Sequence, residues 1–247
     1  MTTGMRKLPN DAPLAAELKA VLTAGETERL RGLLASDPAL ASCVVEDRKG
    51  CGRTLLHLFA DWPGHNPNAA AIVPVLAAAG ADLDAPAVAM WHRETPLHWA
   101  ASNDDVALID ALLDAGADIE RDGSSIDGGA PLSCAVGYGQ WAAARRLVAR
   151  GARTRLWHEA ALGMMAELAR RFEADAAPDA DALCASFWQA CHGGQLAAAR
   201  YLLERGAELN WRSPWSSETP LDIAEAAAHS DVAAWLRESG AIRAKQA

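Results

Sequence analysis

Short apolar segments separated by polar breaks recur along the chain, and Glu94–Glu120 shows this pattern most completely. In this segment Thr95 can cap a helix through its hydroxyl group. Pro96 then occupies the first helical position, where a missing N–H group costs nothing. The helix is predicted to be short, because its apolar residues lead directly into the polar run Ser102–Asp105.

A second helix is predicted immediately after this polar run. Either Asp104 or Asp105 can cap it, and Gly116 is expected to end it, because glycine readily adopts the left-handed conformation. Its apolar positions lie three and four residues apart, which is the helical period; they are Val106, Ile109, Leu112 and Leu113. Neither helix can bury its apolar face alone, so the pair needs neighbours on both sides.

Related segments occur elsewhere in the chain at a nearly constant interval. The segments that match the start of the first helix are Thr54–His57, Ala130–Ser133 and Thr219–Asp222. The glycines that follow the second helices are Gly80, Gly116, Gly151, Gly206 and Gly240. Successive members of this series lie about 35 residues apart, except where one glycine is missing between Gly151 and Gly206, and a period of 20 to 50 residues is typical of repeat architectures.

The motif TPLHxAA, followed by a second helix and GAD, resembles the ankyrin repeat. The resemblance implies an all-α ankyrin-repeat solenoid, divergent and of bacterial type, with about six helix-turn-helix units and short projecting hairpins. We expect a single domain over residues 14–247, preceded by a disordered tail at 1–13. The expected units are a capping unit at 14–45 and repeats at about 49–84, 85–120, 121–153, 154–180, 181–210 and 211–243.

Composition limits the classes of function. The chain has 247 residues, and its hydrophobic content of 51% is ample for a continuous core. No run of eighteen apolar residues is present and the first eleven residues lack an apolar stretch, so we expect neither a membrane span nor secretion. Five cysteines without a CxxC pair favour a reduced, cytoplasmic setting. A net charge of −9 disfavours nucleic acid as a partner.

No motif for a metal or a cofactor is found. HExxH and CxxC are absent, and so are the P-loop and GxGxxG, so we expect no metal site and no cofactor.

The resemblance to ankyrin repeats places ligand contacts on a concave groove formed by the hairpin tips and the first helices. The residues assigned to it are Trp62, Trp91, His92, Glu94, Trp99, Asn103, Tyr138, Glu159, Gln189, His192 and Trp215. Nine tryptophans against three phenylalanines and two tyrosines is an unusual balance. Tryptophan combines a large contact area with one hydrogen-bond donor, which suits anchoring of a ligand or a partner.

Several of the tryptophans have a second interpretation. Trp99, Trp188 and Trp235 are expected to pack between repeats, although Trp99 also remains a candidate contact. Trp62 lies in a loop interrupted by two prolines and a glycine, and it can either contact a ligand or fold back over the adjoining helices. For Trp91 and Trp215, at hairpin tips, binding is the favoured role.

The histidines divide in the same way. His57, His98 and His158 stand at the histidine position of the motif, and we interpret them as structural. His92 and His192 do not stand at that position. Together with Glu94 and Glu159 they are the candidates for acid–base chemistry, since a partly desolvated carboxylate or imidazole can titrate near neutrality.

Two functions follow from these residues. The first is a recognition module that binds a partner protein, a peptide or a small apolar ligand in the tryptophan-lined groove. The alternative is a non-canonical enzyme that uses the same groove for hydrolysis, elimination or isomerisation of a small molecule. A binding face should be open, whereas an enzyme needs a closed pocket with convergent polar groups.

Overall fold

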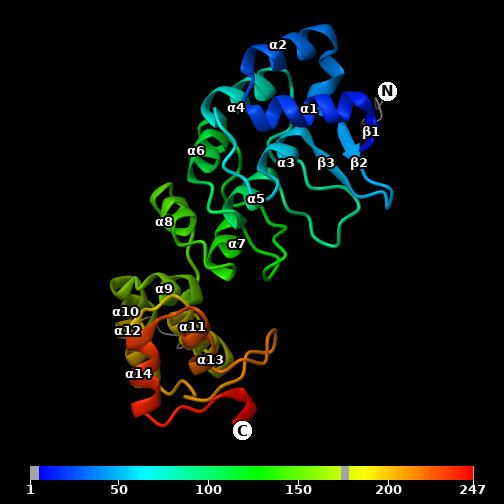
Figure 1. Ribbon diagram of the computed structural model, residues 1–247. Coiled ribbons are helices and arrows are strands. Elements are labelled where there is room, and N and C mark those ends of the chain that lie inside the picture. The colour runs from blue at the N-terminus through cyan, green and yellow to red at the C-terminus, as the bar shows by residue number, and fades with distance from the viewer. Residues whose placement is uncertain (1–5, 174–177, 247) are drawn as a thin grey trace. The chain divides into compact units, whose positions relative to one another are not determined.

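The computed structural model describes residues 6–173 and 178–246, which divide into two compact units, Met1–Ala152 and Arg153–Ala247 (Figure 1). The described residues form fourteen α-helices and only three short strands. This confirms the predicted all-α fold of repeated helix pairs. The acidic loop at 173–179 falls largely outside the described residues. The single domain expected over 14–247 stays a prediction.

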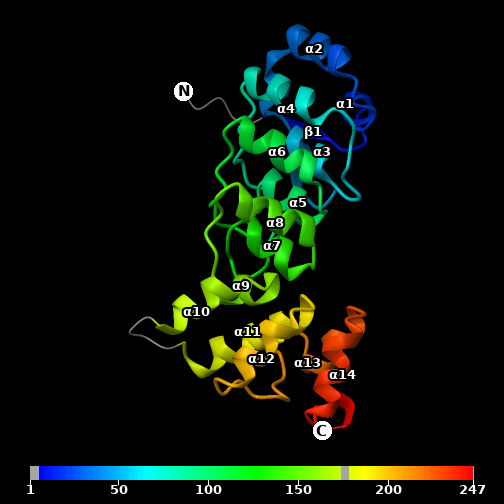
Figure 2. The same ribbon diagram turned by 90° about the vertical axis from the view of Figure 1, so that its left-hand side faces the viewer.

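The first unit is a stack of helix pairs in two layers. Its helices are α1 (Pro13–Ala24), α2 (Thr27–Ser36), the short 3-10 helix η1 (Pro38–Ser42), α3 (Leu55–Ala60), α4 (Ala69–Ala78), α5 (Pro96–Ser102), α6 (Val106–Asp114), α7 (Pro131–Gly137) and α8 (Trp141–Ala149). The first helices of the pairs pack in the order α1, α3, α5, α7, and the second helices in the order α2, α4, α6, α8 (Figures 1 and 2). Each pair therefore buries its apolar face against its neighbours, as the repeat pattern requires.

A small sheet covers the start of this unit, and the sequence did not predict it. Strand β2 (Val44–Glu46) pairs antiparallel with β3 (Gly52–Thr54) and parallel with β1 (Lys7–Pro9). The disordered tail predicted for 1–13 is therefore wrong over residues 7–13, since β1 is paired and α1 begins at Pro13. The free edge of β2 supplies backbone partners, and Leu8 is buried against the core. Residues 1–5 lie outside the described part.

Backbone hydrogen bonds join the hairpins of consecutive repeats. The N–H group of Arg93 donates to the carbonyl oxygen of Gly123 at 3.0 Å. Gly123 has a φ of +137°, and a Cβ atom there would lie 2.4 Å from the carbonyl oxygen of Arg93, so only glycine fits. Gly116 follows α6 with a φ of +101°, as its predicted role at the helix end requires.

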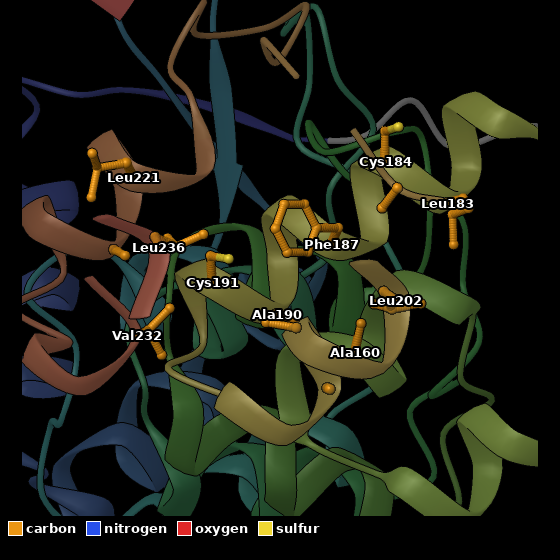
Figure 3. Packing of buried hydrophobic residues seen from close by; sticks show 14 of the residues in the cluster. Ala160, Leu183, Cys184, Phe187, Ala190, Cys191, Leu202, Leu221, Val232 and Leu236 are labelled. Carbon is orange, nitrogen blue, oxygen red and sulfur yellow. The ribbon is translucent and has the colours of Figure 1, made fainter. Parts of the chain in front are cut away.

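The second unit repeats the helix-pair arrangement. Its helices are α9 (Leu156–Leu162), α10 (Met165–Glu173), α11 (Ala180–His192), α12 (Leu196–Leu203), α13 (Pro220–Ala226), α14 (Ser230–Glu238) and the 3-10 helix η2 (Ala244–Gln246). Helix α11 packs against α9, α12 and α13. Figure 3 shows Phe187 of α11 at the centre of a cluster that includes Leu202, Val232 and Leu236, all fully buried.

The motif histidines connect neighbouring repeats. The ring of His98 is fully buried, and its Nδ1 atom accepts the backbone N–H of Thr95 at 3.1 Å. Its Nε2 atom therefore carries the proton and donates to the carbonyl oxygen of Gly129 in the next repeat at 3.2 Å. His57 does the same from the preceding repeat, donating to the carbonyl oxygen of Glu94 at 3.1 Å. The structural interpretation of these histidines agrees with their contacts.

The buried histidines make stability depend on pH. Burial lowers the pKa of His57 to about 4 and that of His158 to about 3, from an unfolded value of 6.5. At a pH between the folded and the unfolded pKa, the unfolded chain binds protons that the folded chain does not. The free energy of unfolding therefore decreases as the pH falls from 6.5 towards 4. We expect the free energy of unfolding in urea to fall over this window, and His57→Gln to make the slope shallower by up to about 1.4 kcal/mol per pH unit. Equal slopes in the two proteins would contradict the neutral, buried state of His57.

Candidate functional site

An open cleft of about 350 Å³ lies in the first unit, beside the hairpin tips and the first helices. It is lined by Asp61, Trp62, Glu94, Trp99, Ser102, Asn103, Tyr138 and Gln140. Three consecutive repeats contribute these side chains. Five of the eleven predicted contact residues are therefore brought together here, and they are Trp62, Glu94, Trp99, Asn103 and Tyr138.

The loop after α3 presents Trp62 to solvent. Its backbone is anchored by the N–H of Trp62, which donates to Asp61 Oδ1 at 3.0 Å, and by the N–H of His65, which donates to Asp105 Oδ2 at 2.7 Å. The other carboxylate oxygen of Asp61 pairs with Arg53. The Trp62 side chain is 82% exposed, so it does not fold back over the helices. The backbone of this loop is thus held by hydrogen bonds, whereas the indole ring that it carries is mostly exposed to solvent.

The other walls of the cleft come from α5 and the end of α7. Trp99 is half-buried, with its ring edge-on to the buried ring of His57 at a centroid distance of 4.9 Å, so it belongs to both the core and the cleft. Asn103 donates its side-chain amide to the carbonyl oxygen of Ala60 at 2.8 Å. Tyr138 is 51% exposed, and its hydroxyl group lies 3.1 Å from the hydroxyl of Ser125.

Glu94 is a buried carboxylate on the same cleft. Its Oε1 atom accepts the backbone N–H of Ser125 at 2.7 Å and the thiol of Cys134 at 3.4 Å. Burial alone would raise its pKa, but the hydrogen bonds from Ser125, the nearby ring of His92 and the thiol of Cys134 together outweigh burial and hold the pKa below the usual value for a glutamate. Glu94 is therefore ionised at neutral pH.

Two predicted contact residues of the same hairpin do not line the cleft. Trp91 is 83% exposed, and its ring packs edge-on against the ring of His92 at 5.1 Å. His92 is turned inward instead, and its Nδ1 atom accepts the backbone N–H of Glu94 at 3.4 Å.

The remaining candidates belong to the second unit, where tryptophans form a cluster of their own. Trp188 is buried, as expected for a core residue, and its ring meets that of the half-exposed Trp215 at 5.4 Å. Gln189 is buried too, and its side-chain oxygen lies 3.2 Å from Nδ1 of His192. Burial lowers the pKa of His192 to about 4, so its ring is neutral at physiological pH.

The carboxylate of Glu159 forms a buried ion pair. Arg171 of α10 donates Nε to Oε2 at 2.8 Å and Nη2 to Oε1 at 2.9 Å, and the hydroxyl of Thr154 donates to Oε1 at 2.6 Å. The carboxylate is 3% exposed. Glu94 and Glu159 thus lie in different units, each held by its own set of donors. The acid–base set expected from Glu94, His92, Glu159 and His192 stays a prediction.

Sequence reasoning missed some groups that shape this site. Gln140 lines the cleft two residues after Tyr138, where the preceding repeat has Asp105 two residues after Asn103. Asp105 itself is buried and caps α6, so the alignment of the two repeats carries no signal for the role of Gln140. Ser125 has no sequence signal, because its contribution comes from a backbone N–H group.

The described part of the chain offers neither a metal site nor a membrane span. No group of three or more histidine, cysteine, aspartate or glutamate side chains lies close enough to hold a metal ion. None of the helices between residues 6 and 246 that the structure describes is both long and apolar enough to cross a bilayer.

The fold and the cleft define a helical-repeat protein whose hairpin tips and first helices form an open surface. The family model for ankyrin repeats (three copies) matches residues 19–123 and 56–156, which together span more than half of the chain. The chain belongs to the ankyrin repeat family. No curated protein matches the sequence. Ankyrin repeats are generally protein–protein interaction modules.

The ion pair of Glu159 gives a test of how the second unit is held together. Arg171→Met leaves a buried carboxylate without its guanidinium, and we expect the free energy of unfolding to fall by about 2–4 kcal/mol. Arg170→Met is the matched control on the same helix, since Arg170 is 69% exposed and pairs with Glu167 one turn away. The control should change stability by less than about 0.5 kcal/mol. Equal urea midpoints for the two variants would show that the Glu159 pair contributes nothing.

Proposed function

We propose that the cleft lined by Trp62, Trp99 and Tyr138 binds an extended segment of a partner protein, without catalysis. The observation that carries this proposal is the exposure of Trp62 and Tyr138 on one cleft, at 82% and 51%. Large aromatic side chains of this kind supply most of the binding energy in many interfaces. Because they come from different repeats, an occupant that contacts both must span the repeats.

The dimensions of the cleft support a peptide more than a small molecule. A volume of about 350 Å³ is at the lower end for pockets that enclose small ligands, and this cleft is open. It has room for one or two side chains of a longer segment. Trp91 extends the exposed aromatic surface along the hairpin beyond the cleft, where the rest of such a segment can make contact.

The protonation states of the candidate acids and bases also favour binding. A general base works best when its pKa lies near the operating pH. The pKa of Glu94 lies below its usual value, and that of His192 is about 4, so both are weak bases. The lone pairs of Glu159 already accept three side-chain donors. These features support recognition over the acid–base alternative.

The proposal is tested by selecting peptides from a random display library with the wild-type protein. Trp62→Ala should weaken binding of the selected peptides by at least about tenfold, since it removes a contact worth roughly 2 kcal/mol. Trp215→Ala removes an exposed indole from the second unit and serves as the control, with binding unchanged. Affinities can be measured by fluorescence anisotropy on labelled peptides, with circular dichroism to check each fold. Selected peptides that bind Trp62→Ala and Tyr138→Ala as tightly as the wild type would contradict the proposal.

A further inference from the structure

We propose that the segment bound in this cleft is proline-rich and adopts the polyproline II conformation, with two prolines three residues apart that contact successive repeats. This inference rests on the proposed function and names the chemistry of the partner. It is carried by hydrogen-bond donors that line the cleft and have no acceptor within the described part of the protein.

Two of these donors are the indole N–H groups of Trp62 and Trp99. Neither group has a hydrogen-bond acceptor among the described residues. The Trp62 side chain is 82% exposed, so its N–H group is open to solvent. Trp99 is half-buried, but no buried side-chain nitrogen or oxygen atom of the described residues lacks a partner, so its N–H group must also contact solvent. Both rings line the cleft, which makes both groups donors for a bound segment.

Gln140 supplies a third donor. Its side-chain amide makes no hydrogen bond within the part of the chain that the structure describes, so it too contacts solvent, and the residue lines the cleft. Gln140 lies between α7 and α8, whereas Trp99 lies on α5 and Trp62 follows α3. The three donors therefore come from three consecutive repeats.

The carboxylates of the cleft, by contrast, are already engaged. Asp61 pairs with Arg53. Glu94 accepts the backbone N–H of Ser125 at 2.7 Å, and its Oε2 atom lies 3.5 Å from Nδ1 of His92. The charged acceptors of the cleft thus have partners inside the protein, while the indole and amide donors are available to a ligand.

Free donors favour a segment whose backbone carbonyl groups are free. In a helix the carbonyl groups are bound internally. A strand offers its carbonyl groups, but it also brings N–H groups that need acceptors of their own. A polyproline II segment has no internal hydrogen bonds, and each proline removes one N–H group. The hydrogen-bonding groups of the cleft therefore match this conformation better than the other two.

The spacing of the repeats matches the same conformation. The first helices α5 and α7 pack directly against each other, and packed helices lie about 8–10 Å apart. A polyproline II segment advances about 9 Å in one turn of three residues, so residues three apart point the same way and meet successive repeats. In a strand, residues three apart point to opposite faces.

The aromatic walls suit proline rings. Trp62, Trp99 and Tyr138 line the cleft, and aromatic-lined grooves are a recurring type of receptor for polyproline II segments. Proline also restricts its own backbone, so the segment loses little conformational entropy on binding. This saving is important for an open cleft, which encloses little of its ligand.

The test measures the affinities of four pools of labelled random peptides for the wild-type protein by fluorescence anisotropy. The pools fix two prolines three residues apart, two prolines two residues apart, two valines two residues apart, or two α-aminoisobutyrate residues four apart. The second pool has the same proline content in the wrong register, the third favours a strand and the fourth favours a helix. We expect the first pool to bind at least about fivefold more tightly than each of the others.

Substitutions test the donors separately. Trp62→Phe keeps an aromatic ring and removes the N–H group, at a side chain too exposed for the change to disturb the core. Gln140→Met removes the amide and keeps a side chain of similar length. Each should weaken binding of the first pool by about three- to tenfold, as expected for the loss of one hydrogen bond. Trp215→Phe makes the same change at an exposed indole of the second unit and should alter the affinity by less than about twofold.

Each of the remaining outcomes has a distinct meaning. Equal binding of the two proline pools, or tightest binding of the valine pool, would overturn the inference and leave the proposed function standing if that binding is lost in Trp62→Ala. Unchanged affinity of the first pool in both Trp62→Phe and Gln140→Met would overturn the role of the donors on which the inference depends. Tightest binding of the α-aminoisobutyrate pool, or absence of any binding that depends on Trp62, would overturn the proposed function and this inference together.

Discussion

The structure of the first unit depends on the hydrogen bonds by which a buried motif histidine holds the hairpin of the next repeat. His57 donates to the backbone carbonyl of Glu94, and His98 donates to that of Gly129. A neutral, fully buried imidazole is required at each step, because a charged ring would be costly to bury and could not accept from the threonine that caps its helix. The hairpin that carries Glu94 is thereby fixed to the repeat before it.

Glu94 connects this structural chain to the cleft. Its backbone carbonyl is bound by His57, while its side chain accepts from the backbone of Ser125 in the following hairpin. One residue thus links three repeats and places a carboxylate among Trp62, Trp99 and Tyr138. The same contacts that stabilise the stack keep this carboxylate ionised, so its charge is a direct consequence of how the repeats are joined.

Much of this could be predicted from the sequence, because ankyrin repeats are encoded locally. Thr95, Pro96 and Gly116 mark the ends of their helices through backbone preferences that do not depend on the rest of the chain. Strand β1 could not be predicted, since three residues ending in a proline carry no periodic pattern and pair only because β2 leaves an edge free. The burial of the Glu94 and Glu159 side chains could not be predicted either. A charged residue at a hairpin tip or on a helix suggests exposure, and only the tertiary contacts with Ser125 and Arg171 show otherwise.

The central claim is that a segment of a partner protein binds at the cleft of the first unit, and the indole N–H signals of the nine tryptophans test it most directly. In a titration of the ¹⁵N-labelled protein with a peptide selected by the wild-type chain, the signals of Trp62 and Trp99 should shift together with saturation. Those of Trp188 and Trp235, in the second unit, should stay unchanged. Saturable shifts confined to Trp188, Trp211 and Trp215, with Trp62 and Trp99 unmoved, would contradict the account.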